Sequence, residues 1–387
     1  MTNHKIFILT LLAIHASIID LRFLSSNNVN LYIQMIANIL LLIEISKYLS
    51  ILWKKYKTLN WSAILFSLSY LYSTFNIWHS EIPFSLVSPY TSILQFLKVI
   101  TLLFFIEYIN ESKKTILFLK YFLYIVGGYL IIANINIITG IKIKGNDMDI
   151  SIIGDKFITS YLNLFWISIF AQYQLFTKNK FQLFKYRVLI ILSCITASIS
   201  QCSTGIIVGI FMIGSTYFQN FYKILQRPMI ICISILILDL GGYLFYNLVL
   251  SIPFIQNIIV NGLGEDLTLT GRTLIWEALA TILNERPIWG FGPGNETIVI
   301  QNLINLTNAQ NGLIHTYLGI GIIGIICFFI LLYNIVQRSK YSVIIFFIYG
   351  LIIASTIEVT LETSFLCYAT FMILQNPSKQ LKKYYDD

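Results

Sequence analysis

Residues 270–296, TGRTLIWEALATILNERPIWGFGPGNE, interrupt a chain that consists otherwise of long apolar runs. This stretch opens with a Gly-Arg pair and closes on a glycine-rich turn that contains three of its four glycines, Gly290, Gly292 and Gly294. Between them, Ile275, Leu279 and Ile282 recur at helical spacing, which predicts a short amphipathic helix that Pro287 ends. The rest of the sequence is therefore interpreted around this segment.

The composition identifies the class of protein. Hydrophobic residues make up 57% of the 387 residues and charged residues only 11%, whereas soluble domains carry about 25% charged residues. Apolar runs of roughly 20 residues are long enough to cross a bilayer, and in lipid they form helices because every backbone group needs an internal partner. The alternating ten-residue segments of a β-barrel are not found. The sequence predicts an all-α integral membrane protein.

The apolar runs predict about 12 transmembrane helices in a single polytopic membrane domain, 1–387. We expect the spans at 6–20, 30–48, 60–77, 89–108, 115–137, 157–176, 186–201, 203–220, 229–251, 313–335, 341–356 and 359–376. The first run lacks a small-residue cleavage pattern and is taken as a span, not as a signal peptide.

Basic residues predict the orientation of the helices. With both termini in the cytoplasm, the lysine and arginine clusters near residues 54–57, 113–114, 178–187, 223–227 and 338–340 and in the C-terminal tail all lie inside. This asymmetry accounts for most of the formal charge of +8, so no nucleic-acid partner is implied. The five cysteines fall mostly within spans, without the spacing of metal ligands.

Two outward connections are long enough to suggest function. The smaller covers residues 139–156 and the larger, which is expected to contain short helices, covers residues 252–312. Long loops inside a compact domain are uncommon and are often functional. Lys156, Arg272 and Arg286 lie in these outer segments, where basic residues are normally scarce. Guanidinium groups bind phosphate oxygens at two points, although pairing with nearby acidic residues would also explain the two arginines; these are Glu265, Asp266, Glu277 and Glu285.

Several polar residues lie at membrane depth. Asp239 lies near the middle of a span and is expected to bond within the bundle. Glu358 and Glu362, four residues apart, are either functional or paired with a loop arginine. Lys98 and Lys120 are interpreted as snorkelling side chains. His315 follows the large loop directly and is either an acid-base group or an interfacial residue.

Gly271-Arg272, Trp276, Pro287 and the run Gly290, Gly292, Pro293, Gly294 together resemble the signature of the O-antigen polymerase and ligase superfamily, whose members have about twelve spans and a large late periplasmic loop. Asn311, Gly321 and Gly324 match a second family spacing, but Gln310 stands where the ligases have histidine. Ser203-Thr204-Gly205 is similar to a turn between two family spans, without its usual arginine. Since glutamine cannot accept a proton at neutral pH, the substitution favours the polymerase branch.

The resemblance implies a metal-independent membrane glycosyltransferase that needs no cofactor and acts at the periplasmic face of a bacterial plasma membrane. It would polymerise undecaprenyl-diphosphate-linked repeat units into O-antigen or capsular polysaccharide. The partners implied are the lipid-linked donor and acceptor, membrane lipid, and a chain-length regulator and flippase of the same pathway. The candidate catalytic residues are Arg272, His315, Glu296 and Glu277. The candidate binding residues for diphosphate and glycan are Arg272, Arg286, Lys156, Gly292, Gly294, Asn295, Gln310 and Asn311.

Three alternatives remain. An O-antigen ligase would transfer finished polymer to lipid A core, and His315 would then replace the missing histidine. A lipid-linked oligosaccharide flippase would also use about twelve spans, but related halves and short loops are expected of it. A non-catalytic scaffold would leave the outer arginines beside a glycine-rich turn unexplained.

Overall fold

A computed structural model describes residues 2–19, 27–78, 89–140, 151–178, 182–217, 222–257, 260–261, 272–304, 308–339 and 342–376. Within these ranges the protein is all-α, apart from an isolated bridge between Ser151 and Gly154. The first half of the chain contains α1 (Asn3–Ser17), α2 (Asn27–Ser46), α3 (Leu49–Lys55), α4 (Lys57–Trp78), α5 (Pro89–Glu111), α6 (Thr115–Thr139), α7 (Lys156–Lys178), α8 (Leu183–Ile199) and α9 (Ser203–Ser215). The second half contains α10 (Tyr222–Leu225), α11 (Pro228–Ile235), the π-helical turn η2 (Leu236–Leu240), α12 (Gly241–Leu250), α13 (Pro253–Asn257), α14 (Arg272–Leu279), α15 (Asn295–Ile304), α16 (Gly312–Arg338), α17 (Ile344–Ser355), α18 (Thr363–Thr370) and the 3₁₀ turn η4 (Phe371–Ile373).

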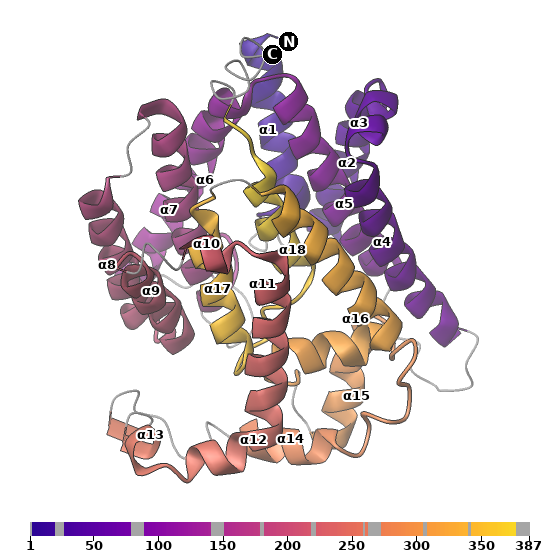
Figure 1. The fold of residues 1–387 in the computed structure, drawn as a ribbon, viewed down its shortest axis with the longest axis vertical. Helices are drawn as coiled ribbons and strands as arrows, with labels where there is room; N and C mark the ends of the chain where they lie inside the picture. Colours follow the sequence, from indigo (N-terminus) through magenta and orange to yellow (C-terminus); the bar gives the residue numbers. More distant parts are fainter. Residues whose placement is uncertain are drawn as a thin grey trace.

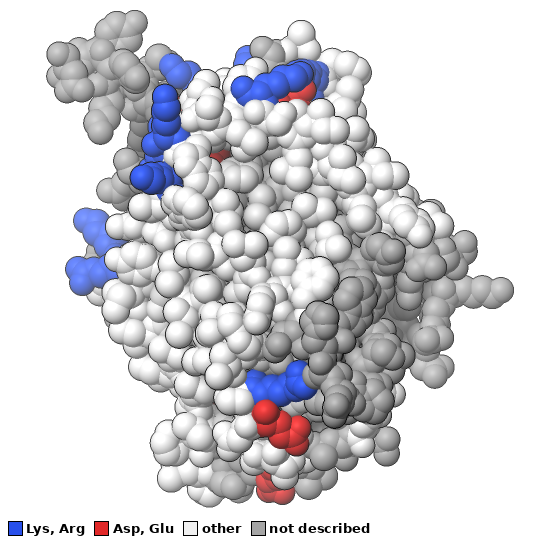
Figure 2. All heavy atoms as spheres, turned by 90° about the vertical axis from the view of Figure 1, so that its right-hand side faces the viewer, with Lys and Arg blue, Asp and Glu red and all other residues white. Residues whose placement is uncertain are grey.

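Five helical segments of the described chain are long and apolar enough to cross a membrane. They are Val29–Ser46, Ser92–Glu111, Thr115–Thr139, Pro228–Phe245 and Gly312–Arg338. On α6, Ile131, Ile135 and Ile138 expose more than half of their surface at helical spacing, as expected of a face that contacts lipid. Figure 2 shows a broad uncharged surface between charged side chains near the two ends of the molecule. These features indicate a multi-pass membrane protein.

A helix lies at each of the positions predicted for a span, but the count of about 12 transmembrane helices is not confirmed. Ser203–Ser215, Ile344–Ser355 and Thr363–Ile373 are apolar yet shorter than a bilayer requires. The boundaries differ most near residue 240, because the predicted single span is divided there into α11, η2 and α12. Asp239 lies in the π-helical turn, is fully buried, and accepts a hydrogen bond from Ser355 Oγ at 2.9 Å. The prediction that it bonds within the bundle is confirmed.

The helices form a bundle with the large loop at one end. α16 packs against α4 and α11, while α5 packs against α2, α4 and α18. Figure 1 shows α12, α13, α14 and α15 together at the end of the molecule farthest from α3. The described part of the 252–312 segment therefore forms a distinct layer over one end of the bundle.

This layer has a small hydrophobic core of its own. Trp276 is buried in it, and its Nε1 donates a hydrogen bond to the carbonyl of Ala309 at 3.1 Å. Further members of the same core come from α14, from the turns that follow it, from α15 and from the first turns of α16; they are Ile275, Leu279, Ile282, Phe291, Val299, Ile300, Ile314 and Leu318. The predicted amphipathic helix is thus present, although it ends at Leu279 and continues as turns to Pro287. Because the apolar side chains of the loop pack on α16, the loop is fixed to the bundle.

The backbone of α16 is interrupted at Gly321, whose φ of 65° and ψ of −172° are not helical. The interruption frees carbonyl groups at the end of the first half of the helix. Phe291 N–H donates to the Leu318 carbonyl at 2.6 Å, and Gly292 N–H donates to the Gly319 carbonyl at 2.9 Å. The glycine-rich turn, residues 287–294, therefore supplies the donors that the broken helix lacks.

The second half of α16 is capped by the same turn. Ile322 N–H donates to the Pro287 carbonyl at 2.9 Å, and Ile323 N–H donates to the Ile288 carbonyl at 3.3 Å. A backbone break at membrane depth is tolerated only where protein satisfies the freed groups. Donors and acceptors on both sides of this break find partners within one short segment.

Two glycines allow the turn and the broken helix to approach this closely. A Cβ on Gly321 would lie 2.3 Å from the Ile288 carbonyl oxygen, and one on Gly290 would lie 2.6 Å from the Leu318 carbonyl oxygen. Both glycines also have positive φ, 65° and 71° respectively. Side chains at these positions would meet backbone atoms that cannot rotate away.

We expect Gly321→Ala to lower the free energy of unfolding by at least about 2 kcal/mol, since it combines a positive φ with a backbone collision. Gly128→Ala is the matched control, because a Cβ at that helical position meets nothing within 4 Å. The control should be neutral or slightly stabilising. Denaturation of the purified variants in lipid nanodiscs measures the difference, and equal stabilities would contradict this account of the break.

Candidate active site

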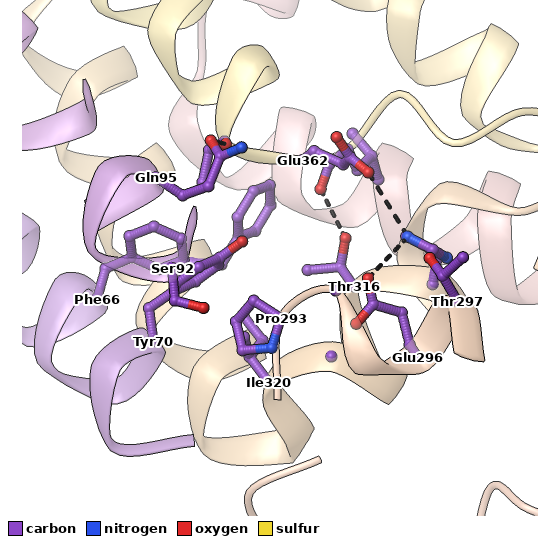
Figure 3. A pocket seen from close by; sticks show the side chains of 16 residues that line it. Phe66, Tyr70, Ser92, Gln95, Pro293, Glu296, Thr297, Thr316, Ile320 and Glu362 are labelled. Atoms are coloured by element: carbon purple, nitrogen blue, oxygen red, sulfur yellow. Dashed lines mark hydrogen bonds and ion pairs between the residues drawn. The ribbon is translucent and has the colours of Figure 1, made fainter. Parts of the chain in front are cut away.

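A cavity of about 310 Å³ lies beside the interruption in α16. It is lined by α4, α5, α15, both halves of α16, the segment that leads into α18 with the first residue of that helix, and the end of the glycine-rich turn (Figure 3). Its lining residues are Phe66, Tyr70, Ser92, Gln95, Pro293, Gly294, Glu296, Thr297, His315, Thr316, Gly319, Ile320, Phe328, Leu361, Glu362 and Thr363. The volume is at the lower end of the roughly 300–1,000 Å³ typical of small-molecule sites.

Glu296 is placed in the cavity by the glycine-rich turn. α15 begins at Asn295, directly after the turn, and Asn295 Nδ2 donates to the Phe291 carbonyl at 3.1 Å. Because Gly292 N–H donates a hydrogen bond to the Gly319 carbonyl, the start of α15 is held against α16. A Cβ on Gly319 would lie 3.5 Å from Glu296 Oε2. The carboxylate is 7% exposed, so it enters the cavity from a buried position.

His315 is presented by the first turns of α16. Asn311 caps this helix, since its Oδ1 accepts a hydrogen bond from Ile314 N–H at 3.0 Å. His315 Nε2 lies 3.3 Å from Glu296 Oε1 and 3.5 Å from Glu362 Oε1. One imidazole nitrogen therefore faces two carboxylates, as the dashed lines in Figure 3 show.

Glu362 approaches the same nitrogen from the segment that precedes α18. Thr316 Oγ1 on α16 donates to the Leu361 carbonyl at 2.6 Å, which ties this segment to the histidine-bearing helix. The side chain of Glu362 is 47% exposed, in contrast to the buried Glu296. The three groups, called here the Glu-His-Glu cluster (Glu296, His315 and Glu362), can accept a proton inside the cavity and pass it toward an exposed carboxylate.

The sequence-predicted site residues divide into two sets. Glu296, His315 and Gly294 are brought together in the cavity lining. The other predicted residues of this region are not among the described lining residues and have structural contacts; they are Gly292, Asn295, Gln310 and Asn311. Gly292 N–H bonds to α16, Gln310 N–H donates to Asn308 Oδ1 at 3.0 Å with a positive φ of 50°, and Asn311 caps α16.

Of the predicted basic residues whose side chains the structure describes, Arg286 and Lys156 are not among those that line the cavity. The Arg286 guanidinium lies 6.0 Å from the centre of the Phe291 ring. Lys156 Nζ donates to the Gln201 carbonyl at 3.0 Å, at the start of α7. Glu277 is exposed on α14. Arg272 begins α14, which packs against α15, and its side chain is outside what the structure describes.

Sequence reasoning missed the wall opposite the Glu-His-Glu cluster. Phe66 and Tyr70 come from α4, and Ser92 and Gln95 come from α5. These residues belong to apolar runs in which no motif marks them. Glu362 carried a signal, because a carboxylate at membrane depth is costly without a role. Its contact with His315 could not be inferred from the spacing of the two residues along the chain.

The described lining contains two carboxylates and no lysine or arginine. No group of three His, Cys, Asp or Glu side chains in the described part of the chain has the geometry of a metal site. The carboxylates and the imidazole that are present can transfer protons and hydrogen-bond to a polar ligand.

Comparison of the chain with protein-family models, with curated proteins and with solved structures found no match.

Substitution of Asn311 tests whether its side chain stabilises the N-terminus of α16. We expect Asn311→Ala to destabilise the protein by about 1–2 kcal/mol, since the cap of α16 and the bond from Asn311 Nδ2 to the Asp239 carbonyl, 3.1 Å, are both lost. Asn311→Asp keeps the cap acceptor and should be less damaging. Thermal unfolding measures both, with Asn334→Ala in the same helix as control; equal effects at the two positions would contradict a capping role.

Proposed function

We propose that the protein is a membrane glycosyltransferase that joins lipid-linked oligosaccharide repeat units, as in the polymerases of the O-antigen superfamily that it resembles. The reaction would take place at the periplasmic face of a bacterial plasma membrane and would produce O-antigen or capsular polysaccharide. Its substrates would be two glycans carried on undecaprenyl diphosphate, supplied by a flippase, and a chain-length regulator would act with it.

The Glu-His-Glu cluster is the observation that carries this proposal. A sugar hydroxyl is a weak nucleophile, and a base within hydrogen-bond reach activates it. Glu296 is buried and in contact with His315, while Glu362 reaches the exposed side of the cavity. This arrangement supports removal of a proton from an acceptor hydroxyl and its release toward solvent.

The bond changes follow from the substrates. The acceptor oxygen attacks the anomeric carbon of the donor glycan, and the bond from that carbon to the diphosphate oxygen breaks. The acceptor proton passes to the Glu-His-Glu cluster, and the electron pair of the broken bond stays on undecaprenyl diphosphate. Fixed cations near the leaving group lower this barrier. The family resemblance gives this role to Arg272, whose helix packs against α15.

The nature of the acceptor separates a polymerase from a ligase. Gln310 stands where the ligase motif has histidine, and His315 lines the cavity five residues later. A polymerase would extend a lipid-linked repeat, whereas a ligase would transfer the glycan to a lipid A core. Mass analysis of the product distinguishes these outcomes.

We expect Glu296→Gln and His315→Gln to reduce transfer by about 100-fold or more, because each removes a proton acceptor from the cluster. The assay uses purified protein in nanodiscs with a synthetic lipid-linked repeat unit and follows the ladder of products by gel. His15→Gln is the matched control, since His15 lies in α1, contacts the Tyr129 hydroxyl at 3.3 Å and does not line the cavity. Wild-type ladders from both cluster variants would remove the cluster from the mechanism.

Arg272→Ala should leave single repeat units without long polymer, because the leaving diphosphate loses a fixed cation. Arg272→Lys should recover little activity, since a lysine cannot hold phosphate oxygens at two points. Arg227→Ala, at the start of α11, is the control for loss of one arginine. Normal chain lengths in cells that carry only Arg272→Ala would exclude this role.

A further inference from the structure

The cavity has two chemically different sides (Figure 3). Glu296 and Glu362 lie on one side, and four residues of α4 and α5 lie on the other: Phe66, Tyr70, Ser92 and Gln95, called here the α4–α5 wall. We propose that the α4–α5 wall binds the acceptor sugar as an uncharged pyranose ring and selects among sugars. This inference rests on the proposed function and names the part of the substrate that enters the cavity.

Ser92 gives the clearest sign that this wall meets a ligand. Its side chain is 1% exposed and lines the cavity, and its hydroxyl has no hydrogen-bond partner among the described residues. A buried hydroxyl without a partner is unfavourable and is uncommon in native proteins. A ligand hydroxyl in the cavity would satisfy it, since each hydroxyl both donates and accepts.

Gln95 extends the same polar strip by one helical turn. Its Oε1 accepts a hydrogen bond from Thr363 Oγ1, which fixes the amide between α5 and the start of α18. The amide nitrogen is a donor, so the wall can offer both donors and acceptors to neighbouring hydroxyls. Thr363 directly follows Glu362 in the sequence. Its hydrogen bond to Gln95 therefore fixes the position of the α4–α5 wall relative to the Glu-His-Glu cluster.

The aromatic residues suit the apolar face of a sugar ring. The Phe66 and Tyr70 ring centres lie 5.8 Å apart, and Phe66 also contacts Phe328 at 6.2 Å, so the rings support one another. A pyranose presents C–H groups on its faces and hydroxyls around its edge. Aromatic rings beside a few placed polar groups match that distribution.

The charge of the cavity disfavours binding of the diphosphate group of the lipid-linked substrate. Two carboxylates and one imidazole line it, and the described lining contains no lysine or arginine. Like charges repel at these distances, and more strongly away from water. A diphosphate would therefore bind elsewhere, and the uncharged sugar of the acceptor is the part that fits.

Binding of small glycosides tests this assignment without any donor. The protein is placed in lipid nanodiscs, because detergents with sugar headgroups would compete, and methyl glycosides of common hexoses and N-acetylhexosamines are titrated by saturation-transfer NMR. At least one glycoside should bind. Ser92→Ala should weaken its binding about three- to tenfold, the loss of one hydrogen bond, and Ser92→Leu should abolish it by filling the cavity.

The control is Ser67→Ala on α4. Ser67 is equally buried and also lacks a partner among the described residues, but it does not line the cavity, so this variant should bind like the unmodified protein. Both alanine variants remove a hydroxyl without breaking a hydrogen bond between described residues, so folding is expected to survive. Inorganic diphosphate at equal concentration should not displace the glycoside.

The outcomes separate this inference from the proposed function. Glycoside binding that depends on Ser92, in a protein that transfers nothing, supports the α4–α5 wall and overturns the transferase proposal. Transfer that is unaffected by Ser92→Leu, with no Ser92-dependent glycoside binding, overturns the wall and keeps the transferase. Displacement by diphosphate that depends on Ser92 also overturns the assignment of an uncharged sugar.

Discussion

A helix that is interrupted in lipid leaves backbone donors and acceptors without partners, and in α16 the interruption at Gly321 is matched by the backbone of residues 287–292. Four hydrogen bonds join the two segments, two on each side of the break. Because they are made by the backbone, they depend on close approach and not on particular side chains. That approach requires hydrogen at the Cα positions of Gly290 and Gly321. The sequence motif of spaced glycines thus has a structural cause that is independent of any substrate.

The position of the cavity follows from the same contact. The turn leads directly into α15, so fixing the turn against α16 also fixes Glu296 beside His315. Ser73 of α4 strengthens the arrangement, because its hydroxyl donates to the Trp289 carbonyl and lies 2.9 Å from the Gly319 carbonyl. One polar side chain of an early helix thereby contacts both the turn and the broken helix. The groups proposed for catalysis are held by rigid neighbours and not by a free loop.

Much of the architecture could be predicted from the sequence, and much of the site could not. Apolar runs are a direct consequence of helices in lipid, so helices lie where spans were expected. The number of crossings is a harder problem, because α9, α17 and α18 are apolar but short. Glu296 was predicted as a member of the large loop, and His315 was predicted from its place directly after that loop. Asn311 was predicted to bind substrate, whereas its side chain caps α16; both roles need the same polar atoms, and spacing does not distinguish them. Ser92 and Gln95 depend on which helices become neighbours, and no local pattern records that.

The walls of the cavity come from both ends of the chain, from α4 and α5 and from residues 293–363. During synthesis the early helices enter the bilayer long before the segment that carries Glu362 has left the ribosome, since domains are made from the N-terminus onward. A nascent chain therefore lacks one wall of the cavity until the segment that carries Glu362 has been made.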